Sequence, residues 1–165
     1  MAMTTTISPI YLTNATLTPN RATYKVALDG PSGVGKSWMV RAMFSPTTPT
    51  MVVPTMGVEV HPICYGEDEL YNMWDMGGHP TRRGIGEGYY VGSDLALFML
   101  PTYDEEVITN YVRRLHEVVP RCPYLVIVRS PLDTHECRHA TIYLPHDGSV
   151  SDVLAIMRDI LTRSI

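Results

Sequence analysis

The sequence has few cysteines and no long hydrophobic run. Its three cysteines, Cys64, Cys122 and Cys137, are odd in number and lack C-x-x-C spacing, which predicts reduced thiols and argues against a metal site built on them. The longest uninterrupted apolar run, residues 95–100, is far shorter than the roughly 20 apolar residues of a membrane-spanning helix. The N-terminus has no positively charged stretch followed by an apolar one, so we expect no signal peptide. We therefore expect an intracellular protein of nucleus and cytoplasm without membrane contact.

Charge of either sign is also modest. The 165 residues include 13 lysines and arginines and 17 aspartates and glutamates, giving a formal charge of −4. Because nucleic-acid-binding surfaces are usually basic, this balance argues against nucleic acid as a partner. Hydrophobic residues make up 45% of the chain, an ordinary fraction for a folded domain. The length suits a single domain with one core.

Strand and helix patterns alternate along most of the chain. Residues 1–23 are rich in Thr, Asn and Pro and are interpreted as an N-terminal extension, which places the folded domain at 24–165. The predicted strands are 24–29, 57–65, 70–74, 95–100, 124–128 and 141–144, and the predicted helices are 36–44, 104–119 and 150–161. This alternation predicts a three-layer α/β domain, with a mainly parallel six-stranded sheet and helices on both faces. The second and third strands are predicted to form a hairpin.

Two segments carry further expectations about packing. In the predicted helix 104–119, the side chains at helical spacing are expected to face the core; they are Val107, Tyr111, Leu115 and Val118. Residues 76–92 are rich in glycine and are interpreted as a mobile segment. We expect Tyr89 and Tyr90 to pin the far end of this segment.

Residues 30–37 read G-P-S-G-V-G-K-S between a predicted strand and a predicted helix, and they satisfy the phosphate-loop pattern G-x-x-x-x-G-K-[ST]. Glycines let successive backbone N–H groups converge on an anion, and the helix N-terminus adds partial positive charge. In this pattern Lys36 reaches the β- and γ-phosphates, and the hydroxyl of Ser37 ligates Mg²⁺. The loop residues predicted to bind the nucleotide are Gly30, Ser32, Gly33, Val34, Gly35, Lys36, Ser37 and Trp38.

Two further motifs follow the phosphate loop in order. Residues 54–62 read P-T-M-G-V-E-V-H-P, and residues 74–78 read W-D-M-G-G. With the phosphate loop and the later G-Y-Y run, they resemble the small GTPases, and most closely the Ran family, over roughly residues 24–128. The resemblance implies that Thr55 and Asp75 hold Mg²⁺ together with Ser37, Asp75 acting through a bound water. It also implies that Thr55 and Gly78 contact the γ-phosphate, so that loss of this phosphate relaxes both loops.

The chain departs from the family at the residue that orients the attacking water. Small GTPases usually carry glutamine there, whereas this chain has His79. The resemblance assigns catalytic roles to His79, Lys36 and Thr55. Neutral imidazole donates and accepts as an amide does, but with a different reach, so we expect slow intrinsic hydrolysis of GTP to GDP and phosphate. The alternative is a surface histidine without a part in hydrolysis.

The base-recognition motif is eroded as well. The family's N-K-x-D aligns with S-P-L-D at residues 130–133, which retains only Asp133, and His146 lies in the loop that replaces S-A-K. The resemblance implies that Asp133 and His146 contact the nucleotide. Asp133 favours guanine over adenine because adenine has no donor at N1. Each lost base contact costs about 1–3 kcal/mol, so we expect weakened affinity and guanine preference. Residues 130–139 are also short for a parallel crossover of about a dozen residues, so the family's fourth helix is expected to be reduced or absent.

These residues are compatible with three functions. The first is a monomeric, Ran-like GTP/GDP-binding switch that uses residues 55–62 and 76–92 to engage an importin-β-type transport receptor or other effector, with an exchange factor and an activating protein as regulators. The second is a pseudo-GTPase binding module that mimics Ran without turnover, such as a viral copy of a host Ran. The third, a P-loop nucleoside monophosphate kinase, fits worse because 165 residues leave little room for an acceptor-binding segment and an arginine-bearing lid.

Overall fold

The computed structural model describes residues 21–44, 57–65, 68–77, 86–132 and 137–163. The elements in these ranges are β1 (Ala22–Asp29), α1 (Lys36–Phe44), β2 (Val58–Tyr65), β3 (Glu69–Met76), the 3-10 helix η2 (Gly86–Tyr90), β4 (Leu95–Leu100), α2 (Glu105–Val118), β5 (Tyr124–Val128), β6 (Thr141–Tyr143) and α3 (Ser151–Arg163). Every predicted strand and helix is present, with ends that differ by a few residues. Of the described helices, none has the length and hydrophobicity needed to cross a bilayer.

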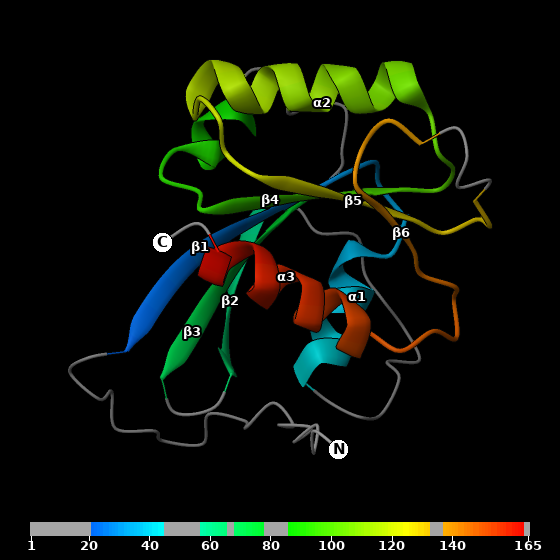
Figure 1. Cartoon of the computed structure of the whole chain (residues 1–165). Helices are drawn as coiled ribbons and strands as arrows, with labels where there is room; N and C mark the ends of the chain where they lie inside the picture. The colour runs from blue at the N-terminus through cyan, green and yellow to red at the C-terminus, as the bar shows by residue number, and fades with distance from the viewer. Residues whose placement is uncertain (1–20, 45–56, 66–67, 78–85, 133–136, 164–165) are drawn as a thin grey trace.

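The strands form one six-stranded sheet with the order β2-β3-β1-β4-β5-β6 (Figure 1). Only β2 and β3 pair antiparallel, which confirms the predicted hairpin, and the other neighbours are parallel. β1 begins at Ala22, where it pairs with Glu69, earlier than the predicted start of the domain at Tyr24. β4 is buried at every position, as its uninterrupted apolar sequence predicts for a strand covered on both faces.

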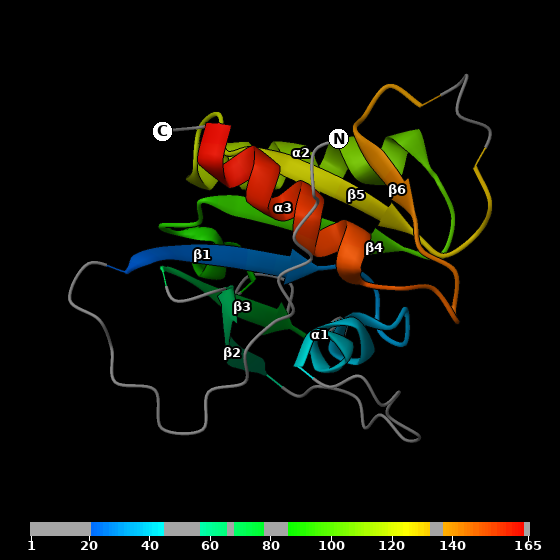
Figure 2. The same cartoon turned by 60° about the horizontal axis from the view of Figure 1, so that its bottom comes forward.

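Helices cover both faces of the sheet, so the predicted three-layer fold is confirmed. Helix α2 lies across one face, and α1 and α3 lie across the other (Figures 1 and 2). Alternate residues of β4 supply the two cores: Leu97 packs on the side of α1 and α3, whereas Phe98 packs on the side of α2 and η2. This alternation follows from the two-residue period of a strand.

Helix α2 begins at a capped end, but its buried face differs from the predicted one. The side chain of Asp104 accepts a hydrogen bond from the backbone N–H of Val107 at 3.1 Å, which satisfies a donor that the first turn leaves open. Ile108 and Leu115 are buried, whereas Val107 is 39% exposed. The expectation that Val107 faces the core was therefore wrong. Val107 and Ile108 are both compatible with helical spacing to Leu115, and the position of the sheet decides between them.

The connection from β5 to β6 contains no helix in its described residues, 129–132 and 137–140. For those residues, the expected reduction of the fourth helix is confirmed. Parallel pairing between β5 and β6 is retained, with Val126 opposite Thr141.

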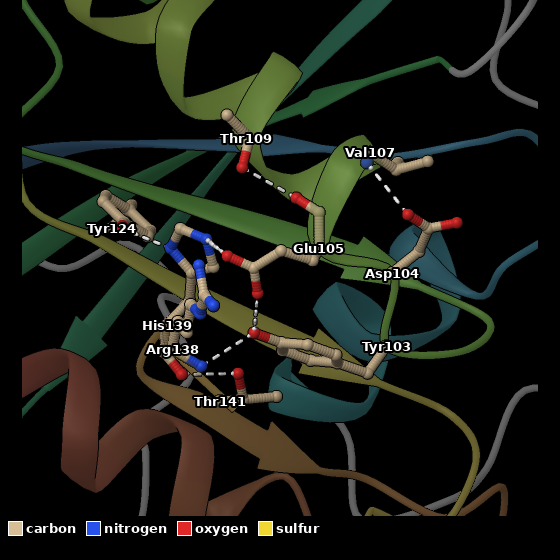
Figure 3. A network of polar contacts seen from close by, with 9 residues as sticks. All are labelled: Tyr103, Asp104, Glu105, Val107, Thr109, Tyr124, Arg138, His139 and Thr141. Carbon is tan, nitrogen blue, oxygen red and sulfur yellow. Dashed lines mark hydrogen bonds and ion pairs between the residues drawn. The ribbon is translucent and has the colours of Figure 1, made fainter. Parts of the chain in front are cut away.

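A polar network joins this connection to the start of α2 (Figure 3). The carboxylate of Glu105 accepts a hydrogen bond from the hydroxyl of Tyr103 at 2.6 Å and lies 3.2 Å from Nε2 of His139. The other ring nitrogen of His139 lies 2.7 Å from the hydroxyl of Tyr124. The backbone N–H of Arg138 donates to the oxygen of Tyr103 at 3.0 Å. These contacts position the start of β6 in the short connection.

Candidate nucleotide site

The phosphate loop leaves β1 beside β4 and turns sharply. Gly30, Gly33 and Gly35 have φ angles of 148°, 77° and 108°, in the region that favours glycine. A Cβ atom on Gly30 would lie 2.1 Å from the carbonyl oxygen of Met99 in β4, so this position has no room for a side chain. The glycines thus let the loop pass close to the sheet in backbone conformations of the kind that form anion-binding nests.

Lys36 folds back over its own loop. Its ammonium donates hydrogen bonds to the carbonyl oxygens of Gly30 at 2.7 Å and Pro31 at 2.9 Å. The residue is only 6% exposed, so its charge is held against the loop. A buried positive charge beside a glycine-rich loop at a helix N-terminus suits a polyphosphate. The assignment of Lys36 to nucleotide binding fits this geometry.

Ser37 and Asp75 meet at the start of α1. The hydroxyl of Ser37 donates to Oδ2 of Asp75 at 2.5 Å, and Asp75 lies fully buried near the end of β3, opposite Leu28 of β1. The other oxygen, Oδ1, is buried without a hydrogen-bond partner in the described structure. Buried carboxylates are normally paired or coordinate a metal.

This pair fits magnesium. Hydroxyl and carboxylate oxygens are ligands that Mg²⁺ accepts, and this ion usually takes only one or two protein groups together with waters and substrate phosphates. The described residues accordingly contain no group of three or more His, Cys, Asp or Glu side chains that could hold a metal by themselves. Ser37 and Asp75, both predicted metal ligands, are therefore close together. A bound Mg²⁺ would neutralise phosphate charge at this position.

Several predicted site residues lie outside the described residues. These are Thr55, Gly78, His79 and Asp133, and the predictions made for them are not tested by the structure. Two others belong to the described loop: Ser32 is exposed and Val34 is 8% exposed.

Asp29, which the sequence analysis did not select, connects the loop to η2. Its Oδ1 accepts a hydrogen bond from the backbone N–H of Gly30 at 2.7 Å, and its Oδ2 accepts one from the hydroxyl of Tyr90 at 2.5 Å. Burial, followed by the charge of Asp29, raises the pKa of Tyr90, so the phenol remains a donor. Tyr90 is fully buried and pins this segment as expected. Tyr89 is half-buried and packs near Trp74.

Arg129 is a second residue that the sequence analysis missed. It follows β5, where its backbone N–H donates to the carbonyl oxygen of Leu100 at 3.0 Å. Its guanidinium carbon lies 4.9 Å from the ring centre of Trp38, and its Nη2 lies 2.8 Å from Nδ1 of His146. Arg129 thereby brings together two predicted nucleotide-binding residues from distant parts of the chain. The only signal in the sequence was an arginine directly after an apolar strand.

The mainly parallel sheet, the lysine-bearing loop after β1 and the acidic end of β3 place the molecule among the P-loop nucleotide-binding proteins. Residues 25–133 match the family described as Roc: Ras of Complex, Roc, domain of DAPkinase. The matched region contains the loop, the β2–β3 hairpin and the central strands, and the chain belongs to this family of Ras-like GTPases. Members of the Ras-like superfamily bind GTP or GDP with Mg²⁺, as the resemblance to small GTPases implied.

Proposed function

We propose that this protein is a GTP- and GDP-binding switch with slow intrinsic GTP hydrolysis. The observation that carries the proposal is the pairing of Ser37 with buried Asp75 beside the lysine-bearing loop. One carboxylate oxygen is left without a hydrogen-bond partner there, which suits a Mg²⁺ ion delivered with a nucleotide. The family match supports guanine nucleotides as the ligand class.

The switching part of the proposal rests on the connection between the phosphate loop and the chain that follows β3. Asp29 at the end of β1 holds Tyr90 of η2, so one end of the glycine-rich segment is fixed to the loop. A γ-phosphate that also engages Thr55 and Gly78 would order the intervening residues, and its loss would release them.

The partners we propose are those that a Ran-like switch would engage. In the sequence, residues 55–62 and 76–92 resemble Ran, and we place the contact with an importin-β-type receptor on these segments. The edge strand β2 supports this surface, because Glu59 and Val60 are exposed on it, Val60 at 47%. An exchange factor and an activating protein would set the ratio of GDP to GTP, in the nucleus and the cytoplasm.

A binding module without turnover is the second candidate. It is favoured by the base-recognition segment, where the family's asparagine and lysine are replaced by Ser130 and Pro131. His146, from the loop expected to contact the base, is instead bonded to Arg129. Such a module would bind its partners in the same way with and without nucleotide.

The test begins with the nucleotide that co-purifies with the protein, identified by chromatography, and with the dissociation constant for Mg·GDP. Lys36→Ala should weaken binding by about 100-fold or more, because it removes a charged contact from a dry site. Arg113→Ala, which removes an exposed cation of α2, is the matched control and should bind normally. Unchanged binding by Lys36→Ala would refute the proposed site.

Two further measurements separate the switch from the module. Single-turnover hydrolysis of bound GTP reports whether any chemistry occurs. Capture by an importin-β-type receptor, compared between GDP and a non-hydrolysable GTP analogue, reports switching. Equal capture in both states, together with no hydrolysis, would favour the binding module.

A further inference from the structure

The guanidinium of Arg129 is buried beside the phosphate loop, and none of the described residues supplies an anionic partner for it. The residue is 8% exposed, and its Nε and Nη1 atoms are buried without a hydrogen-bond partner. Within the described part of the chain, the guanidinium has one hydrogen-bond partner, the Nδ1 atom of His146, 2.8 Å from Nη2. Among the described residues, no carboxylate forms an ion pair with Arg129.

The surroundings of Arg129 orient it toward the loop. A Cβ atom on Gly35 would lie 3.8 Å from the guanidinium carbon and 3.9 Å from Nε. The centre of the Trp38 ring, in the first turn of α1, lies 4.9 Å from the guanidinium carbon. Trp38 and His146 therefore hold the guanidinium, and Nε, one of its unpartnered donors, faces the loop at Gly35.

This arrangement is costly unless a ligand completes it. Burial lowers the pKa of Arg129, but an arginine side chain keeps its charge in a protein. A buried charge without a counter-charge, and buried N–H donors without acceptors, are both strongly unfavourable. An anion with several acceptor oxygens would satisfy the charge and the donors at once.

We propose that Arg129 is a phosphate-binding residue of the nucleotide site, which contacts a phosphate of the bound nucleoside diphosphate or triphosphate from the β5 side of the loop. This inference rests on the proposed nucleotide-binding function and deepens it. Arg129 adds a second buried cation to Lys36 at the phosphate loop. Its contact is independent of the base, and it offsets affinity lost at the base-recognition segment.

A phosphate is favoured over the base as the ligand group for two reasons. The unpartnered Nε of Arg129 lies 3.9 Å from the place of a Cβ on Gly35 in the loop predicted to bind phosphates, and the missing element is negative charge rather than a neutral acceptor. Arginine can also read the O6 and N7 atoms of guanine. That alternative predicts an effect on guanine nucleotides alone.

The experiment compares Arg129→Gln with Arg138→Gln in the full chain. Arg138 lies in the same β5–β6 connection but is exposed, so it controls for the loss of a cation. Dissociation constants for Mg·GDP and Mg·ADP are measured by calorimetry. Arg129→Gln should weaken the binding of both nucleotides by the same factor of about 10 to 100, which corresponds to the loss of one charged hydrogen bond. Arg138→Gln should leave both affinities unchanged. Arg129→Lys should weaken binding less than Arg129→Gln does.

Thermal unfolding without nucleotide separates ligand binding from a structural role. Arg129→Gln should unfold at the same or a higher temperature than the wild type, because it removes an uncompensated buried charge. A lower unfolding temperature with unchanged affinity would make Arg129 a structural anchor and overturn the inference. A loss confined to GDP would overturn it in favour of base recognition.

The same data distinguish this inference from the function on which it rests. Wild-type protein that binds neither nucleotide overturns the proposed function and the inference together. Wild-type protein that binds nucleotide, with a Lys36→Ala variant that does not, supports the function. An Arg129→Gln variant that then binds normally overturns the inference alone.

Discussion

The hydroxyl of Tyr90 donates a hydrogen bond to Oδ2 of Asp29 at 2.5 Å, and Oδ1 of the same carboxylate accepts the N–H of Gly30 at 2.7 Å. One side chain thus connects the first residue of the phosphate loop to the end of η2. Tyr90 is fully buried, whereas Asp29 is partly buried. A single carboxylate therefore connects the loop to η2.

Tyr90→Phe should destabilise the protein without abolishing nucleotide binding. The variant leaves a partly buried carboxylate oxygen of Asp29 without its donor, which costs about 1.5 kcal/mol, the lower end for a hydrogen bond to a charged group. Urea unfolding of the wild type and the variant measures this difference. Tyr89→Phe is the matched control, since the neighbouring half-buried ring lies against Trp74. Equal stability of Tyr90→Phe and wild type would mean that the Asp29 bond contributes nothing.

Gly30→Ala should lower the free energy of unfolding far more than Gly33→Ala does. At Gly30 a new Cβ would collide with the carbonyl oxygen of Met99 at 2.1 Å, whereas at Gly33 no heavy atom lies within 4 Å of it. Overpacking and backbone strain together cost about 2–6 kcal/mol at Gly30. Gly33→Ala incurs only the strain of a positive φ, about 1–2 kcal/mol. Chemical denaturation of both variants tests the order, and the reverse order would contradict the close approach to β4.

Asp75→Asn should weaken magnesium binding without destabilising the fold. The amide keeps the size of the carboxylate but loses its charge, so the gain in GDP affinity on adding Mg²⁺ should fall at least about tenfold. Stability without ligand should stay the same or rise, because a buried charge is removed. Titrations of GDP with Mg²⁺ and with EDTA measure the two affinities. If the Mg²⁺-dependent gain is unchanged, Asp75 does not serve the metal.

The elements were predictable from the sequence because each depends on local pattern. The apolar run of β4 and the glycine-lysine spacing of the loop give strong signals within a few residues. The burial of Ile108 in place of Val107 was not predictable, since both fit the helical period and only the sheet selects one.

The contacts of Arg129 and Asp29 were not predictable for a different reason. Arg129 meets Trp38 and His146 only after β1 and β5 have been placed in one sheet. Asp29 meets Tyr90 only after η2 has packed against α2. In each case the sequence separation is long and no motif marks the partner. These two sets of contacts therefore became visible only in the fold.

The network at the start of α2 should make stability depend on pH through Glu105. The hydrogen bond from Tyr103, with the nearby charges of His139 and Arg138, lowers the pKa of this carboxyl below its usual 4.5. Because the folded-state pKa is depressed, the stabilisation is fully present above the unfolded pKa. It is lost as pH falls through the folded pKa.

Glu105→Gln removes this dependence and supplies the measurement. The difference in unfolding free energy between wild type and Glu105→Gln should be positive at pH 6 and should shrink below about pH 4.5, near the ordinary pKa of glutamate. Glu106→Gln, on the exposed next position of α2, is the control. Tyr103→Phe should reduce the pH-dependent difference, because the hydrogen bond from Tyr103 is the largest cause of the lowered pKa of Glu105. A difference that stays constant from pH 6 to pH 3 would show that the network does not favour the ionised carboxylate.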